Sequence, residues 1–314
     1  MPKLLTVQDL VVEVPARGIK IIDGISFSLD AGQTLGLVGE SGCGKSMTCY
    51  AVANMLPRGI ARSSGAVIFE TDLNAEKSRA PTIAMIFQDP TSSLNPVHTI
   101  GYYLESALWR HQGLKGNDAR LEAMRLLERV GIDRARSRLR AYPHQFSGGM
   151  NQRVMIAHAL AAKPQLLIAD EPTTALDVTM QAQILHLLEE LRAETGMALM
   201  IVSHDLGVIA RLADRAAVMY CGKIVETAPV AELLQRPAHP YARALIDCMP
   251  SIEPGDLEPP VPIPGSVPLL DRLPDGCHFH PRCSRASGAC AARFPAPANV
   301  SPVHQASCYH PVIA

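Results

Sequence analysis

Short apolar runs alternate with helical patterns over residues 1–235. The runs from Thr34 to Val38, from Gln165 to Asp170 and from Ala198 to Ser203 are nearly continuous. Such runs are typical of strands that helices cover on both faces. The alternation therefore predicts an α/β fold built on a parallel sheet.

A long helical stretch lies between Gln88 and the apolar run that begins at Gln165. Its apolar residues recur at helical spacing and predict one buried face, made of Leu121, Met124, Leu126, Leu127 and Val130. A stretch of this extent inside an α/β core predicts a mostly helical subdomain at about residues 89–164.

The composition changes sharply near Pro250, because residues 250–314 hold 13 of the 25 prolines and four of the eight cysteines. Prolines this close together support neither a helix nor a central strand. They predict an extended connector, carried by Pro254, Pro259, Pro260, Pro262, Pro264 and Pro268. We therefore expect two domains, at 1–249 and 250–314, the second ending in a small cysteine-bearing module.

A glycine-rich motif follows the apolar run Thr34–Val38 and precedes a predicted helix at Met47–Met55. Strand, glycine loop and helix in this order predict a phosphate-binding loop, in which backbone N–H groups point at phosphates near the positive end of the helix dipole. Lys45 is expected to reach the β- and γ-phosphates of ATP, and the Ser46 hydroxyl to bind Mg²⁺. The motif comprises Gly39, Glu40, Ser41, Gly42, Cys43, Gly44, Lys45 and Ser46.

Two carboxylates close the apolar run that begins at Gln165. At the end of a buried strand, Asp170 is placed to hold the hydration shell of Mg²⁺. Glu171 is one residue further along and is the candidate general base for the attacking water. The alternative is that both residues only cap the helix that follows.

Three further elements separate the chain from other phosphate-loop proteins. Phe146-Ser147-Gly148-Gly149-Met150 precedes a helical run at Asn151–Ala162, which predicts a second anion-binding helix start. Gln88 follows the apolar run Ile83–Phe87 and can contact Mg²⁺ or water, and His204 follows the run 198–203 and can contact a γ-phosphate. Each is weak alone, but their fixed order is a strong signal.

Bulk properties narrow the class of protein. The 314 residues are 47% hydrophobic, enough for a large core, and the net charge of -1 offers no electrostatic argument for nucleic acid as a partner. No apolar stretch approaches bilayer length, and residues 1–30 lack the features of a signal peptide. We therefore expect a cytosolic chain whose cysteines are reduced.

These motifs together resemble those of the ATP-binding subunit of an ABC transporter. Under that resemblance Gln88 is the glutamine loop, Ser147 to Met150 the family signature, 166–170 Walker B, and Glu171 and His204 the catalytic glutamate and switch histidine. Thr174-Ala175-Leu176-Asp177 resembles the D-loop. The resemblance implies an ATPase that uses ATP and Mg²⁺, the latter through Ser46 and Gln88. It also implies head-to-tail pairing of two ATPase subunits, in which Ser147, Gly148, Gly149 and Met150 serve the partner's nucleotide.

Finer features resemble importers of oligopeptides, dipeptides and nickel. They are Ser-Gly-Gly-Met in the signature, Phe87-Gln88-Asp89-Pro90, Ser93-Leu94-Asn95-Pro96, His239-Pro240-Tyr241 and the cysteine tail. The tail favours peptides over nickel. The resemblance implies two membrane permeases, an extracytoplasmic binding protein and a position at the cytoplasmic face of the bacterial inner membrane. The alternatives are an importer of nickel or metal–opine chelates and a soluble ABC ATPase that is not coupled to transport.

One position departs from the family pattern. Members usually have an aromatic residue near position 14 that stacks on adenine, whereas this chain has Val14 and no aromatic residue before Phe27. The departure predicts loose base selectivity.

Cys277, Cys283, Cys290 and Cys308 are separated by five, six and seventeen residues. Zinc modules usually have at least one gap of two to four residues, and the expected compartment disfavours disulfides. Zinc, unliganded thiols and an iron–sulfur cluster remain as alternatives. The resemblance to peptide importers implies a [4Fe-4S] cluster, which would staple a module with few large apolar residues and leave hydrolysis to the distant nucleotide motifs.

Overall fold

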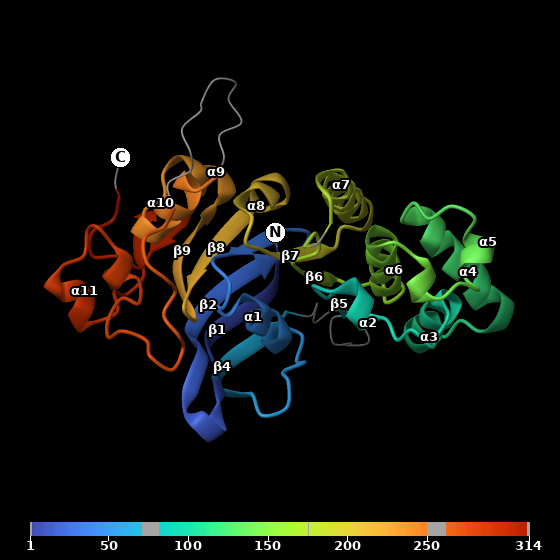
Figure 1. Cartoon of the computed structure of the whole chain (residues 1–314), viewed down its shortest axis with the longest axis horizontal. Helices are drawn as coiled ribbons and strands as arrows, with labels where there is room; N and C mark the ends of the chain where they lie inside the picture. The colour runs from blue at the N-terminus through green and yellow to red at the C-terminus, as the bar shows by residue number, and fades with distance from the viewer. Residues whose placement is uncertain (1, 71–81, 175, 250–261, 313–314) are drawn as a thin grey trace. The chain divides into compact units, whose positions relative to one another are not determined.

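The structure, a computed structural model, describes residues 2–70, 82–174, 176–249 and 262–312. The chain forms two compact units (Figure 1). We refer to residues 1–2 and 71–200 as unit 1, and to residues 3–70 and 201–314 as unit 2. Among the prolines of the predicted connector, Pro254, Pro259 and Pro260 lie outside the described residues, as does Ala175.

Unit 2 contains two sheets. An antiparallel sheet of order β2-β1-β4 consists of β1 (Lys3–Val14), β2 (Ile19–Asp30) and β4 (Ala61–Phe69). The second has the order β10-β11-β9-β8-β3 and consists of β3 (Thr34–Val38), β8 (Arg215–Tyr220), β9 (Lys223–Pro229), β10 (Ala298–Ser301) and β11 (His304–Ala306). Only the pair β3–β8 is parallel in this part of the sheet. Of these strands, only β3 was named from the sequence; the parallel sheet that the sequence predicted is present at the β3–β8 pair, whereas the antiparallel strands were not predicted.

The helices of unit 2 surround these strands. The α-helices are α1 (Lys45–Val52), α8 (Leu206–Leu212), α9 (Val230–Gln235), α10 (Pro240–Asp247) and α11 (Gly288–Ala292), and the 3₁₀ turns are η1 (Pro15–Arg17) and η3 (His280–Arg282). The predicted helix at 47–55 is α1, which starts at Lys45, directly after the left-handed Gly44, and ends at Val52.

Unit 1 combines a parallel strand pair with helices. β5 (Ile83–Ile86) pairs with β6 (Leu166–Asp170), and β7 (Ala198–Ser203) crosses the division between the units. The helices are α2 (Pro90–Ser93), α3 (Ile100–Gln112), α4 (Gly116–Arg129), α5 (Ala135–Arg138), α6 (Gly148–Leu160) and α7 (Val178–Thr195), with a 3₁₀ turn η2 (Pro143–Gln145). Residues 90–160 are thus largely helical.

The predicted apolar face of α4 needs one correction. Leu126, Leu127 and Val130 are buried, but Leu121 is 41% exposed. The buried side of the helix continues instead through Ala119 and Ala123. These two small residues lie at helical spacing from Leu126 and Leu127, so the face rotates away from Leu121.

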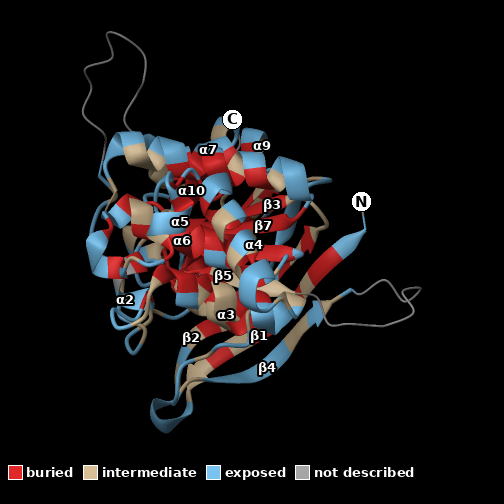
Figure 2. Cartoon of the chain, turned by 90° about the vertical axis from the view of Figure 1, so that its right-hand side faces the viewer, coloured by how far each residue is buried: buried red, intermediate tan, exposed pale blue. Residues whose placement is uncertain are grey.

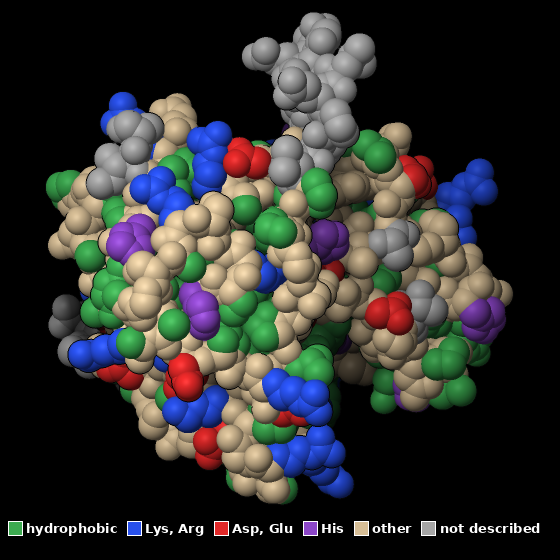
Figure 3. Space-filling view, turned by 60° about the vertical axis from the view of Figure 1, so that its left-hand side comes forward, with side chains coloured by type: hydrophobic (Ala, Val, Ile, Leu, Met, Phe, Trp, Pro, Cys, Tyr) green, Lys and Arg blue, Asp and Glu red, His purple; other side chains and the backbone are tan. Residues whose placement is uncertain are grey.

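Buried residues follow the strands and the inner faces of the helices (Figure 2). β3, β6 and β7 are buried along their whole length, as predicted from their continuous apolar runs. On the face drawn in Figure 3, lysine and arginine side chains are interspersed with acidic ones. No helix among the described residues is both long and apolar enough to span a membrane.

The segment 262–312, which we call the C-terminal module, packs on the core of unit 2. Its strand β11 pairs with β9, where Gln305 lies opposite Thr227 and Ala306 opposite Glu226. His304 contacts the buried Glu226 carboxylate at 2.7 Å, and this carboxylate also accepts the N–H of His239 at 2.6 Å. The module is therefore an extension of the core sheet. From the sequence we instead expected a body held together by its cysteines.

Candidate functional site

The loop at 39–46 has a phosphate-loop conformation. Gly39, Gly42 and Gly44 have φ angles of 157°, 81° and 97°. A Cβ atom on Gly39 would lie 2.2 Å from the Met219 carbonyl oxygen, so the end of β8 leaves no room for a side chain there. Gly44 directly precedes α1, which places the loop at the positive end of this eight-residue helix.

Lys45 is 5% exposed and folds back over the loop. Its ammonium donates to the Gly39 carbonyl at 2.7 Å and to the Glu40 carbonyl at 2.9 Å. The lysine is therefore held in the hollow of the loop by oxygen atoms that a bound phosphate can replace as partners.

Cys43 is fully buried beneath the loop, beside Cys221. A hydrogen bond from the Cys221 thiol favours the Cys43 thiolate and lowers the pKa of Cys43 to about 7, although burial opposes this shift. The same pairing and burial raise the pKa of Cys221. Its partner Cys221 thus makes Cys43 more acidic than an ordinary thiol, but no surface reagent reaches it without opening the loop.

The Glu40 side chain, which also belongs to the loop, points to a partner that sequence reasoning missed. Arg282 of the C-terminal module donates to both of its carboxylate oxygens, at 2.7 and 3.1 Å. We had expected the cysteine tail to be separate from every nucleotide motif. That expectation was wrong, because β11 and the turn η3 bring the tail back to the loop. The run Pro281-Arg282-Cys283 carried no sign of this contact.

In unit 1, Glu171 gathers two of the predicted polar residues around its carboxylate. The Gln88 amide donates to Glu171 Oε2 at 2.9 Å, and the Thr174 hydroxyl donates to the same oxygen at 2.9 Å. Glu171 has a φ angle of 47°, in the left-handed region that glutamate rarely adopts. Such strain is typical of functional positions. Asp170, the last residue of β6, is 1% exposed.

The predicted signature forms the start of α6. Ser147 is the N-cap residue, and its hydroxyl accepts the Met150 N–H at 3.3 Å. Ser147 and Gly148 are exposed, whereas Gly149 is buried against Met180, which a Cβ atom would approach to 2.6 Å. An exposed serine and glycine at a helix N-terminus can accept an anion supplied from outside the chain.

Asp177 and His204 stand at the ends of other elements. Asp177 caps α7, accepting the Met180 N–H at 2.9 Å. His204 is exposed and follows β7 directly. It belongs to unit 2, which also contains the phosphate loop. Gln88, Asp170, Glu171, Asp177 and the signature belong to unit 1. Val14 ends β1 and precedes the 3₁₀ turn η1.

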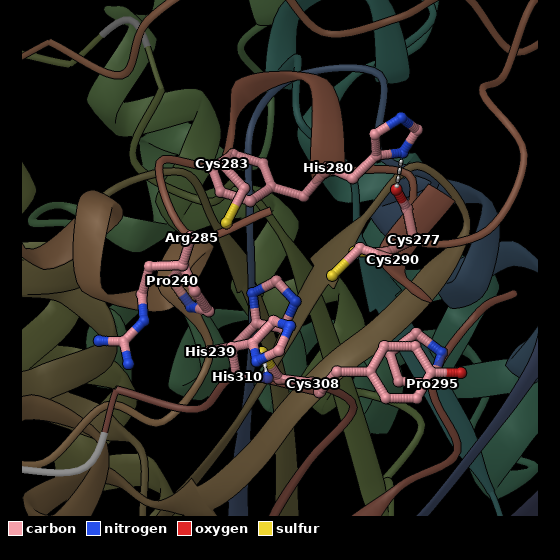
Figure 4. Close-up of a pocket in the computed structure, with 12 residues that line it drawn as sticks. His239, Pro240, Cys277, His280, Cys283, Arg285, Cys290, Pro295, Cys308 and His310 are labelled. Carbon is pink, nitrogen blue, oxygen red and sulfur yellow. Dashed lines mark hydrogen bonds between the residues drawn. The ribbon is translucent and has the colours of Figure 1, made fainter. Parts of the chain in front are cut away.

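The four tail cysteines line one small cavity, together with His239, His280 and His310 (Figure 4). Burial raises the pKa of Cys308 to about 11, and burial also raises the pKa values of Cys277 and Cys283. The His310 N–H donates to the Cys308 sulfur at 3.3 Å. The Nε2 atom of the buried His239 has no hydrogen-bond partner in the described structure.

The spacing of these side chains does not suit a single ion. Within the described residues, no three histidine, cysteine, aspartate or glutamate side chains are grouped so that they could hold a metal ion. The cavity nevertheless brings together residues that are up to 31 positions apart, between Cys277 and Cys308.

Comparisons with known proteins identify the family. Residues 22–174 match the family model described as ABC transporter, and residues 225–290 match the one described as oligopeptide/dipeptide transporter, C-terminal region. The chain is 44% identical over 319 residues to the oligopeptide transport ATP-binding protein OppD of Salmonella typhimurium, covering 98% of this chain and 94% of that protein. It is 42% identical to the dipeptide transport ATP-binding protein DppD of Bacillus subtilis, covering 98% of this chain and 95% of that protein.

A solved structure extends the comparison to the fold. The structure of cbiO1 from Clostridium perfringens, part of the ABC transporter complex cbiONQ, matches with a TM-score of 0.62 and 25% identity. The match covers 75% of this chain and 92% of that one. The α/β phosphate-loop fold predicted from the sequence is thereby confirmed.

Proposed function

Since this chain belongs to the ABC transporter family of ATPases, we propose that it is the ATP-hydrolysing subunit of an importer for dipeptides or oligopeptides. The observation that carries this proposal is the match along 98% of the chain to ATP-binding proteins of oligopeptide and dipeptide transport. The C-terminal match supports the same branch of the family, because its model is described as the C-terminal region of oligopeptide/dipeptide transporters.

The phosphate loop supplies the groups that bind the nucleotide. The backbone N–H groups around Gly42 and Gly44 would surround the phosphates, with Lys45 exchanging its carbonyl partners for β- and γ-phosphate oxygens. Ser46, Asp170 and Gln88 have the hydroxyl, carboxylate and amide oxygens that suit Mg²⁺, which would neutralise the phosphate charge. The geometry of the loop fits this group, because Gly39, Gly42 and Gly44 have the positive φ angles of a phosphate loop and a side chain at Gly39 would clash with the Met219 carbonyl.

Hydrolysis needs a base that activates water. We assign this role to Glu171, whose carboxylate is oriented by Gln88 and Thr174. The water oxygen bonds to the γ-phosphorus as the bond to the β–γ bridging oxygen breaks, and Glu171 takes the water proton. ADP and inorganic phosphate result. His204 would contact the γ-phosphate and report its presence.

The remaining site residues fit a paired assembly. Ser147 and Gly148 are exposed at the start of α6, as they must be if they serve a nucleotide bound to a second ATPase subunit. The family places such a pair under two membrane permeases, so this chain would associate peripherally with the inner membrane through them, on its cytoplasmic face. An extracytoplasmic binding protein would deliver the substrate.

A direct test is to purify the chain with its permeases and measure ATP hydrolysis in vesicles. Stimulation by a peptide-loaded binding protein is expected. Stimulation by nickel or a metal chelate, with none by peptides, would favour the alternative cargo. Failure of the chain to copurify with any membrane permease would favour a soluble ABC ATPase.

The cysteine cavity of the C-terminal module has a donor set that fits a [4Fe-4S] cluster, and we propose that Cys277, Cys283, Cys290 and Cys308 hold one. Each cysteine binds a different iron in such a cluster, so the four sulfurs need not converge on one point. The unpartnered His239 Nε2 in the wall of the same cavity is a hydrogen-bond donor that a cluster sulfur would satisfy. A zinc ion requires four ligands around a single centre, which the described residues do not offer.

Replacing Cys283 with serine tests the cluster. Protein purified without oxygen should be brown, absorb broadly near 400 nm and contain about four irons per chain, and the variant should lose colour and iron. Cys248→Ser is the matched control, because Cys248 lies outside the cavity and should leave the iron content unchanged. Stoichiometric zinc without iron, from iron-replete cells, would show that the cavity is a zinc site.

A further inference from the structure

Arg282 and Glu40 form a two-pronged ion pair between the C-terminal module and the phosphate loop. Nη1 lies 2.7 Å from Glu40 Oε2, and Nη2 lies 3.1 Å from Oε1. The Arg282 side chain is 5% exposed and the Glu40 side chain 26%. A guanidinium and a carboxylate paired through two parallel hydrogen bonds constrain each other in orientation as well as distance.

The other contacts of Arg282 hold it rigidly. Its Nε donates to the Pro264 carbonyl at 2.7 Å, and its Nη1 also donates to the Tyr220 hydroxyl at 3.2 Å. The guanidinium carbon lies 5.8 Å from the ring centres of both Tyr220 and Phe279. Because these contacts use Nε and Nη1, the orientation of the Arg282 guanidinium is set by the module and by the end of β8, and Nη2 is directed to Glu40.

Glu40 is held at three points. Its N–H donates to the Tyr241 hydroxyl at 2.8 Å, its carbonyl accepts from Lys45, and its carboxylate accepts from Arg282. Tyr241 packs against Phe279 of the module, with ring centres 5.2 Å apart. Two of the three restraints on this loop residue therefore come from segments that pack with or belong to the C-terminal module.

We propose that Arg282 is a positioning residue for the phosphate loop, through which the C-terminal module sets the affinity of the site for nucleotide. This inference rests on the proposed function, because it takes residues 39–46 as the nucleotide site. With Glu40 held, the carbonyl that receives Lys45 and the N–H groups that follow it are ordered before nucleotide arrives. Binding then costs less conformational entropy.

The positive charge of Arg282 also raises the affinity for nucleotide, because it neutralises the Glu40 carboxylate. A carboxylate without its arginine would stand beside an incoming triphosphate as a like charge. Arg282 also directly precedes Cys283, which lines the cysteine cavity. A change in the packing of that cavity that moves Cys283 would therefore also move Arg282 and its contact with Glu40.

The test compares three variants of the full-length chain by calorimetric titration with Mg²⁺ and a non-hydrolysable ATP analogue. Arg282→Met removes the fork and its charge, and Arg282→Lys keeps the charge but cannot form the fork. Arg293→Met is the matched control, an exposed arginine of the same module. Without the Arg282 contact, we expect the loop to be in its binding conformation in about one molecule in ten, so the Kd for nucleotide should rise about tenfold in Arg282→Met. Arg282→Lys should show part of this rise, and Arg293→Met none.

A second readout separates positioning from a merely structural role. Coupling between two sites is reciprocal, so nucleotide should slow amide hydrogen exchange in residues 277–290 of the wild type and of Arg293→Met. In Arg282→Met this slowing should be absent. In the assembled transporter, the KM for ATP should rise while kcat stays unchanged, because the fork acts on binding of substrate and transition state alike.

Two results would overturn the inference: an unchanged Kd in Arg282→Met, or an exchange response of residues 277–290 that survives in it. If Arg282→Met loses its thermal unfolding transition, Arg282→Lys decides, and an unchanged Kd there would reject the inference. A wild-type chain that binds no Mg²⁺–nucleotide would instead defeat the proposed function itself.

Discussion

At the scale of single residues, Glu171 carries the chemical step that we propose. Its carboxylate is held by Gln88 and Thr174, and its backbone has an uncommon left-handed conformation. The motif alone could not distinguish a base from a helix cap. The structure favours the base, because Asp177 and not Glu171 is the N-cap of α7.

Replacing Glu171 with glutamine should keep ATP binding and lower turnover by roughly 10²–10⁴-fold, because the amide cannot take the proton of water. Single-turnover hydrolysis and nucleotide titration on the same preparation would separate the two effects. The interpretation requires an inactive partner subunit, so that only sites using Glu171 are counted. Wild-type turnover under that condition would remove Glu171 from the catalytic role.

At the scale of elements, helix starts serve two purposes in this chain. Ser147 caps α6 and Asp177 caps α7. The sequence predicts that Ser147 contacts the partner's nucleotide and that Asp177 belongs to the D-loop. A capping side chain satisfies N–H groups that the helix itself leaves free. Local stability and function thus rest on the same atoms, and a substitution there changes both unless the capping oxygen is kept.

Asp177 allows the two purposes to be separated. Asp177→Ala should lower the free energy of unfolding by about 0.5–2 kcal/mol through loss of the cap, whereas Asp177→Asn should restore most of it. Urea unfolding would measure both. If Asp177→Asn is stable but slow in ATP hydrolysis, the charge has a role beyond capping. Equal stability of the alanine variant and the wild type would show that the cap contributes nothing.

At the scale of the whole molecule, the exposed signature predicts that the site is completed by a second ATPase subunit. Gly148→Glu puts a carboxylate at the exposed start of α6, where we propose that the partner's phosphates lie, and leaves residues 39–46 unchanged. The variant should bind ATP normally but fail to associate with the partner subunit when ATP is present.

Sedimentation with ATP, using the Glu171→Gln background to prevent hydrolysis, would measure that association. Leu121→Glu is a suitable control, because this exposed residue of α4 lies away from the signature in the sequence. Undiminished association of the Gly148→Glu variant would mean that α6 does not face the partner's nucleotide.

The sequence by itself determined the elements that carry the nucleotide motifs. β3 and β7 have the predicted bounds, and β6 differs from its predicted run by one residue. Continuous apolar runs and glycine loops are local signals, and the roles that we propose for Lys45 and Glu171 were inferred from their places after such runs. The chain's membership in its family was also readable from these motifs.

The tertiary structure decided how distant segments meet. Three features depend on packing between residues far apart in the chain. They are the exposure of Leu121, the pairing of β11 with β9, and the contact of Arg282 with Glu40. The Arg282–Glu40 pair joins positions separated by 242 residues, and no periodicity or spacing encodes it. Local patterns specify strands, loops and caps, but a contact of this kind exists only once the sheet has brought the C-terminal module back to the phosphate loop.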